Sequence, residues 1–318
     1  MRTVFLDLQT FSPDVSLSAI ETQVSSLTTY PLTRPEQVVR HGQDAEILIT
    51  NKVVLGRKEL AQLPQLKLIC VAATGTNNID LAAAREFGVA VTNVSDYAGN
   101  SVAQYVFSQI LEYFSQTSHN NQNTDKGLWQ KSPTFCHHGN KIQELAGKKL
   151  GIVGFGHLGQ SVAKIAAAFD MQILIAERPE ASRVREGRMA FEEVVKQSDI
   201  LSLHCPQTPK TENLINAQVL KLMKPGAMLI NSARGAIIDE AALLTALKNR
   251  KIGYAVLDVL SQEPPPAGHI LLDTGLDNLK ITAHIAWASI EAQQRLLNLI
   301  ADNIDAYRHN RQLNRLDC

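Results

Sequence analysis

The sequence of 318 residues predicts an α/β protein with two domains, each built around a doubly wound parallel sheet. Its length is sufficient for two domains of ordinary size, each burying its own hydrophobic core. Short apolar runs alternate with helical patterns in the first hundred residues, and a second series of this kind begins at Lys149. Such alternation is typical of parallel strands joined by helices. Two domains of this kind also predict a cleft between them.

The first domain is predicted from four short apolar runs, which are bounded by turns or helical patterns. These runs cover residues 3–8, 46–50, 67–73 and 89–93. A long helical pattern follows at residues 99–114, and a polar stretch comes after it at residues 115–133. We interpret the polar stretch as a crossing between the domains, because Trp129 within it needs a packing partner.

Six further apolar runs predict the sheet of the second domain. They cover residues 149–155, 171–177, 199–205, 227–233, 252–260 and 279–285. The chain then continues as one helix at residues 288–308. The apolar residues of this helix are Ile290, Leu296, Leu297, Ile300 and Ile304. A helix with such a face most simply packs back on the first domain.

The composition excludes several classes of partner. Lysine plus arginine equals aspartate plus glutamate at 31 each, so no net field attracts nucleic acid or an anionic membrane. The first ten residues lack the apolar centre of a signal peptide, and no run reaches transmembrane length. The four cysteines are widely scattered, without the spacing of a zinc site or a disulfide framework. We therefore expect a cytoplasmic protein that binds small molecules and has no metal site.

Three glycines after the run at residues 149–155 have the spacing GxGxxG: Gly154, Gly156 and Gly159. A strand-like run leads into them and a helical pattern leads out, which is the context of a dinucleotide-binding loop. Gly154 permits the tight turn, Gly156 lets the backbone approach a pyrophosphate, and Gly159 allows close packing of helix and strand. The amides and dipole of the helix N-terminus then favour phosphate binding. The alternative is a glycine-rich turn that serves packing alone.

Glu177 ends the next apolar run and lies 18 positions after Gly159, near the spacing of about 20 expected for a ribose-binding acid. Its carboxylate can accept hydrogen bonds from both ribose hydroxyls, and its charge repels a 2′-phosphate. NAD is therefore favoured over NADP. Arg178 follows directly and softens this repulsion, so NADP remains the alternative cofactor.

Three further residues follow predicted strands of the second domain: Arg234, Glu263 and His284. The carboxyl ends of such strands face the ligand crevice. Reduction of a 2-keto acid needs a cation for the carboxylate and ketone oxygens, a proton donor, and a hydride from a cofactor. Arg234 is predicted to be the cation and His284 the acid and base, while Glu263 holds the imidazole tautomer. The alternatives are a surface salt bridge, a core histidine and a solvated loop acid, respectively.

The chain resembles the D-isomer-specific 2-hydroxyacid dehydrogenase family over nearly all of its length. The segments that carry the resemblance occur in the family's order: GTNNIDLAAA, GIVGFGHLGQ, HCPQTPKTENLI, MKPGAMLINSARGAIIDEAAL, LDVLSQEPPP and HIAWAS. Within the family, AERPE, FCHHG, EPPPA and HIAWAS are most similar to bacterial glycerate dehydrogenases, also called hydroxypyruvate reductases. The resemblance implies reduction of hydroxypyruvate to D-glycerate with NADH, with glyoxylate as a second substrate.

The resemblance also implies an architecture and a set of contacts. Residues 1–98 plus 286–318 form a flavodoxin-like substrate domain, residues 99–285 form a Rossmann-type NAD-binding domain, and the protein is a homodimer. The residues expected to contact the cofactor are Gly154, Gly156, His157, Leu158, Gly159, Glu177, Cys205, Ser232, Ala233, Arg234, Asp258 and His284, with Asp258 near the nicotinamide amide. Those expected to contact the substrate are Thr74, Gly75, Thr76, Arg234, His284 and Trp287.

The sequence departs from the family's pattern at two places and leaves three alternatives open. Ala283 replaces the proline that commonly precedes the catalytic histidine, and Gln104 and Tyr105 stand where glutamate and histidine are common. Trp287 either walls the substrate pocket or packs at the hinge of the domains. The same chemistry on another 2-keto acid is the nearest alternative function. An NADH-sensing protein that resembles a corepressor is the alternative from another class.

Overall fold

The computed structural model describes residues 1–316, so the last two residues of the predicted substrate domain lie outside it. The chain forms two compact units. The first unit contains Met1–Ala98 and the described residues from Ala288 onward, and the second unit is Gly99–Trp287. Both units are α/β structures with parallel sheets, which confirms the predicted fold class. No helix among the described residues has the length and apolar character needed to cross a membrane.

The described part of the first unit contains a sheet of five parallel strands in the order β2-β1-β3-β4-β5. This order is the flavodoxin-like one. Every residue of β3 and β4 is buried, because both faces of a central parallel strand are covered by other elements. The strands are β1 (Arg2–Phe5), β2 (Ser26–Thr29), β3 (Ile47–Thr50), β4 (Leu68–Val71) and β5 (Ala90–Thr92). Strand β2 was not among the predicted strands, since its sequence SLTT is mostly exposed at the sheet edge.

Helix α11 (Ile290–Arg308) packs against the first unit, in contact with α1 (Ser18–Glu21) and β4. The hydroxyl of Ser289 caps it by accepting a hydrogen bond from the backbone N–H of Ala292 at 3.2 Å. Its apolar face is buried at Leu296, Leu297, Ile300 and Ile304. The shorter helices of this unit are α2 (Val38–Gly42), α3 (Arg57–Leu60) and α4 (Leu81–Glu86), with 3₁₀ turns at Leu8–Thr10 and Pro35–Gln37.

The described sheet of the second unit has the strand order β11-β10-β9-β8-β6-β7. A parallel bridge between Ala176 and Met189 adds one further position beyond β7. From β6 the chain adds β7 on one side of the sheet, and it then adds β8, β9, β10 and β11 in turn on the other side. This change of direction between β6 and β8 is typical of Rossmann-type domains and marks the ligand crevice. The strands are β6 (Lys149–Val153), β7 (Gln172–Ile175), β8 (Ile200–Leu203), β9 (Met228–Asn231), β10 (Tyr254–Leu257) and β11 (Leu279–Ile281).

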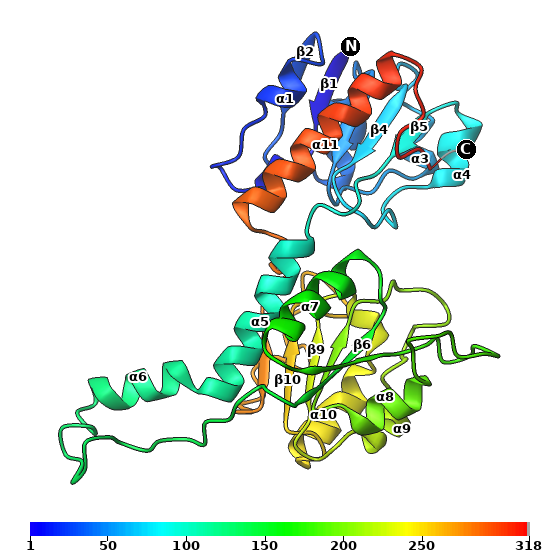
Figure 1. The fold of residues 1–318 in the computed structure, drawn as a ribbon. Coiled ribbons are helices and arrows are strands. Elements are labelled where there is room, and N and C mark those ends of the chain that lie inside the picture. The colour runs from blue at the N-terminus through cyan, green and yellow to red at the C-terminus, as the bar shows by residue number, and fades with distance from the viewer. Residues whose placement is uncertain (317–318) are drawn as a thin grey trace. The chain divides into compact units, whose positions relative to one another are not determined.

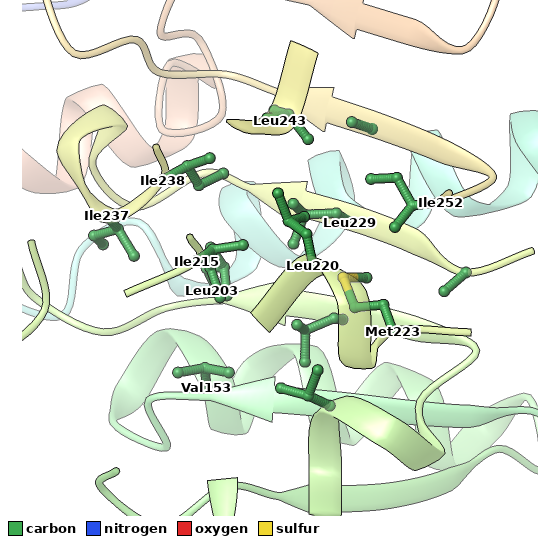
Figure 2. Close-up of a cluster of buried hydrophobic side chains, with 14 of the residues drawn as sticks. Val153, Leu203, Ile215, Leu220, Met223, Leu229, Ile237, Ile238, Leu243 and Ile252 are labelled. Atoms are coloured by element: carbon green, nitrogen blue, oxygen red, sulfur yellow. The ribbon is translucent and has the colours of Figure 1, made fainter. Parts of the chain in front are cut away.

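The core of the second unit fills the space between this sheet and its helices. Figure 2 shows one part of it, where Leu203 and Leu229 of the sheet meet Leu220 and Leu243 of neighbouring helices. The helices are α5 (Gly99–Ser115), α6 (Thr117–Asp125), α7 (His157–Ala168), α8 (Phe191–Gln197), α9 (Ala217–Leu222) and α10 (Glu240–Lys248), with a 3₁₀ turn at Gly235–Ile237. Helices α5 and α7 pack together, with the rings of Phe107 and Phe169 stacked at 5.6 Å.

The polar stretch at residues 115–133 does not cross between the units, so that interpretation was wrong. The stretch lies within the second unit, and α6 with its following loop runs away from the sheet of that unit (Figure 1). We call residues 116–144 the arm. Trp129 is 53% exposed, and its indole N–H donates to the carbonyl of Phe135, which is itself 91% exposed. Helix α6 has no apolar face that would hold it on the core, since only Asn123 is buried.

Candidate active site

The loop after β11 places His284 against Glu263. The imidazole Nδ1 lies 2.7 Å from the Glu263 carboxylate Oε2, while the other carboxylate oxygen accepts a hydrogen bond from the Leu260 N–H at 2.9 Å. The backbone of His284 has a positive φ of 55°, and its N–H donates to the Asp258 carbonyl at 2.8 Å. The ring is therefore held at Nδ1 by an acid that is itself fixed to the loop after β10, and Nε2 remains for a reacting partner.

The buried carboxylate of Asp258 holds the same loop in place by hydrogen bonds. Asp258 accepts hydrogen bonds from the Thr282 hydroxyl at 2.6 Å and from the N–H groups of Ile285 and Ala286 at 2.9 and 2.8 Å. The phenol of Tyr105 lies 2.6 Å from the Thr282 hydroxyl. Burial raises the pKa of Tyr105 to about 12, so this phenol keeps its proton at neutral pH. The family resemblance implied that Asp258 lies near the nicotinamide amide, but the link of Asp258 to residues 282–286 was missed, because only the folded loop brings them together.

Arg234 follows the neighbouring strand β9. Its guanidinium donates to the Ala233 carbonyl at 2.7 Å, and its own carbonyl accepts from the Asn231 side chain at 2.9 Å. The next residue, Gly235, packs directly on the loop after β10, because a Cβ there would lie 1.9 Å from the carbonyl carbon of Leu260. Strands β9, β10 and β11 pair in parallel register. Arg234, Glu263 and His284 therefore emerge at the carboxyl edge of three adjacent strands, with a direct contact between the last two.

The glycine loop has the geometry that a dinucleotide needs. Gly154 has a positive φ of 93°, and a Cβ on it would lie 2.5 Å from the backbone nitrogen of Cys205 on the neighbouring strand end. A Cβ on Gly159 would lie 2.3 Å from the Gly154 carbonyl oxygen. At Gly156, in contrast, a Cβ would meet nothing within 4 Å. Helix α7 begins at His157, followed by Leu158, and has no acid in its first turn. The loop is thus tight on the side of the sheet and open at a helix N-terminus.

The residues after β8 and β9 complete this crevice. Cys205 is buried, which raises the pKa of its thiol to about 11 and keeps the thiol neutral. Ala233 is also buried. The hydroxyl of Ser232 is buried and has no hydrogen-bond partner among the residues that the structure describes. A buried hydroxyl without a partner is costly, so a polar group of a bound cofactor would satisfy it. These features fit the nicotinamide dinucleotide.

Glu177 lies two residues after β7 and is only 3% exposed. Its carboxylate accepts hydrogen bonds from the Arg185 guanidinium at 2.5 and 2.6 Å, and from the N–H groups of Arg178 and Arg185 at 2.9 and 3.3 Å. The guanidinium of Arg185, followed by the Arg178 N–H, holds the pKa of Glu177 far below its usual range. The sequence reasoning missed Arg185, although the arginine-rich segment at residues 178–188 was a signal for it.

The predicted substrate residues lie in both units. Thr74, Gly75 and Thr76 follow β4 in the first unit, where the Thr74 hydroxyl donates to the Val94 carbonyl at 2.9 Å. Trp287 is the last residue of the second unit and is partly buried. Thr74, Gly75 and Thr76 thus belong to the first unit and Trp287 to the second.

Comparison with known proteins identifies relatives of this chain. The family model for the NAD-binding domain of D-isomer-specific 2-hydroxyacid dehydrogenases matches residues 107–286. The glycerate dehydrogenase of Methylorubrum extorquens is 45% identical over 86% of this chain and 86% of its own. The hydroxypyruvate reductase of Blautia hydrogenotrophica is 35% identical over 87% of this chain and 86% of its own. The solved structure of an acyclic imino acid reductase in complex with NADPH and D-Arg has a TM-score of 0.84 at 27% identity, covering 99% of this chain and 100% of its own.

Proposed function

The chain belongs to the D-isomer-specific 2-hydroxyacid dehydrogenase family and is an NAD(P)-dependent reductase of 2-keto acids, and from this premise we propose that it reduces hydroxypyruvate to D-glycerate. Glyoxylate is a slower second substrate, NADH is the preferred cofactor, and NADPH serves less well. The observation that carries the proposal is the 2.7 Å contact of His284 with Glu263. The loop that holds Glu263 follows β10, and Arg234 follows the neighbouring strand β9. The names of the two relatives support the choice of substrate.

The three side chains divide the work of the reaction. The Arg234 guanidinium binds the substrate carboxylate and polarises the ketone oxygen, because its positive charge and planar set of donors match these oxygens. His284 gives the proton on Nε2 to that oxygen as negative charge develops there. Glu263 stabilises the protonated imidazole through Nδ1. The bound dinucleotide supplies the hydride. Trp287, three residues after His284, limits the length of the acid that is accepted.

Oxidation of NADH by a series of 2-keto acids tests this proposal. We expect fast turnover with hydroxypyruvate, slower turnover with glyoxylate, and little with pyruvate, 2-ketoisocaproate or 3-phosphohydroxypyruvate. A preference for either of the last two acids would contradict the proposed substrate. Tight NADH binding without turnover of any acid would favour a sensor of NADH.

Replacement of Glu177 by alanine is expected to relax the choice of cofactor. The variant loses the negative charge that disfavours a 2′-phosphate, so the ratio of kcat/KM for NADPH to that for NADH should rise by about 10-fold, the equivalent of about 1.4 kcal/mol. Steady-state kinetics with both cofactors measure this ratio. Glu180→Ala is the matched control, because Glu180 is an exposed acid of the same loop, paired with Lys210. An unchanged ratio in Glu177→Ala would exclude Glu177 from the ribose site.

A second copy of this chain is the proposed partner of the arm. Trp129, Phe135 and Ile142 are exposed large apolar side chains of the arm, and such surface usually marks a protein interface. Light scattering should give about twice the chain mass of 34.9 kDa, and Phe135→Ser should shift the protein toward the monomer. Phe87→Ser, at an exposed phenylalanine outside the arm, is the control. A monomeric wild-type protein would contradict the proposal.

A further inference from the structure

The carboxylate of Glu240 contacts both ends of the loop that carries Glu263. Glu240 is the first residue of α10, and its Oε1 accepts a hydrogen bond from the Ser261 N–H at 2.8 Å. Its Oε2 accepts from the Ser261 hydroxyl at 2.7 Å and lies 3.2 Å from Nε2 of His269. We call residues 261–269 the acid loop. One carboxylate therefore closes the acid loop around Glu263.

The tautomer of His269 fits this contact. The Leu271 N–H donates to the imidazole Nδ1 at 3.3 Å, so the proton of the neutral ring lies on Nε2 and faces Glu240. The side chains of His269 and Glu240 are only 7% and 11% exposed. A hydrogen bond between groups so well covered is stronger than the same bond in water, because the local dielectric is low.

The acid loop has little packing of its own beyond its first residue, which lies against Gly235. Residues 262–268 are all exposed, and their sequence QEPPPAG contains no large apolar side chain. Segments with few buried contacts open more easily than strands or helices. Glu263, in contrast, must keep its carboxylate 2.7 Å from the ring of His284. The hydrogen bonds to Glu240 therefore supply order that burial does not.

We propose that Glu240 is a positioning residue for the reaction, which acts through Glu263 by fixing the acid loop, and that His269 assists it. The inference rests on the roles proposed above for Glu263 and His284. Without the contacts of Glu240, the loop shifts and the carboxylate of Glu263 leaves the imidazole. His284 then loses the group that orients it and stabilises its charge.

A double-mutant cycle on the full-length protein distinguishes positioning from general support of the fold. Glu240→Gln keeps the shape of the side chain but has only one acceptor oxygen. We expect kcat for hydroxypyruvate to fall by about 10- to 100-fold, as for a small displacement of a catalytic group, with NADH affinity within about 3-fold of wild type. In a Glu263→Ala background the same change should lower kcat by less than about 3-fold, because its effect passes through Glu263.

Two further variants bracket this result. Ser261→Ala removes one hydroxyl donor at an exposed position and should give a smaller loss of kcat. Glu193→Gln is the matched control, since Glu193 is also an acid in the first turn of a helix of the second unit, paired with Lys196 at an exposed position. Its kcat should stay within about 2-fold of wild type, as expected for an exposed ion pair. Equal falls of kcat from Glu240→Gln in the two backgrounds would overturn the proposal.

Hydrogen exchange of the protein without substrate tests the anchor independently of turnover. Backbone amides of residues 261–271 should exchange at least about 10-fold faster in Glu240→Gln than in wild type, whereas those of β8 should not change. Unchanged exchange of these residues would contradict the proposal, and so would faster exchange with unchanged kcat. If the wild-type protein reduced none of the keto acids, the proposed function would fail, while the exchange result would still decide whether Glu240 holds the loop.

Discussion

Replacing His284 by alanine is expected to lower kcat for keto-acid reduction by about 10²- to 10⁴-fold, the usual contribution of a positioned acid and base. The variant removes the imidazole that lies 2.7 Å from Glu263 Oε2, and with it the donor for the developing alkoxide. Affinity for NADH should change little, because the glycine loop and the crevice after β8 lie on other strands.

Stopped-flow measurement of NADH oxidation, with a separate titration of NADH binding, distinguishes the two effects. His309→Ala is the control, since His309 is an exposed histidine at the end of α11. A His284→Ala protein whose kcat stayed within about 3-fold of wild type would remove His284 from the role of acid and base, because proton transfer catalysis is worth far more than this.

Replacing Arg234 by glutamine is expected to reduce kcat/KM for hydroxypyruvate by about 10²- to 10³-fold, comparable to loss of one preorganised donor to a developing oxyanion. Glutamine keeps an N–H donor on a shorter side chain but removes the charge and the paired donors that bind a carboxylate. KM for the acid should rise together with the fall in kcat, because the same guanidinium binds the carboxylate and polarises the ketone.

Arg250→Gln provides the matched comparison, since Arg250 is exposed and pairs with Asp277 at 2.6 Å. This pair does not lie at the strand ends that carry the site. Arg234→Lys should retain more activity than Arg234→Gln, because it keeps the charge without the planar fork. Equal activity of Arg234→Gln and Arg250→Gln would show that Arg234 does not touch the substrate.

The sequence predicted the parts of the fold that are buried on both faces. Strands such as β3 and β8 lie in mostly apolar runs and are buried throughout, so their type and their positions along the chain followed from the sequence pattern. Strand β2 escaped because an exposed edge strand places no such demand on its residues. Trp129 misled the interpretation of the arm, since exposure of a large ring depends on partners that a single sequence does not display.

The candidate site could be predicted where a residue's place depends on one strand end. Arg234 and His284 each follow a strand by three residues, so the parallel register carries them to a common edge. The hydrogen bonds from Arg185 to Glu177 depend instead on a loop that brings Arg185 back to a residue eight positions earlier, and hydrophobic periodicity does not encode that contact. The links of Asp258 to the loop at residues 282–286 likewise arise only when two loops meet.

The chain passes from the first unit to the second after Ala98 and returns to the first after Trp287, and this order has a consequence for biosynthesis. The second unit is one continuous segment, whereas the first unit ends its sheet at β5 by residue 92 and receives α11 only from residue 290. A ribosome therefore delivers a complete second unit while the sheet of the first unit still lacks the helix that packs against it. Contacts between segments so distant in sequence form late and slowly. Nascent chains of this protein thus expose the surface that α11 covers until residues 290–308 have been translated.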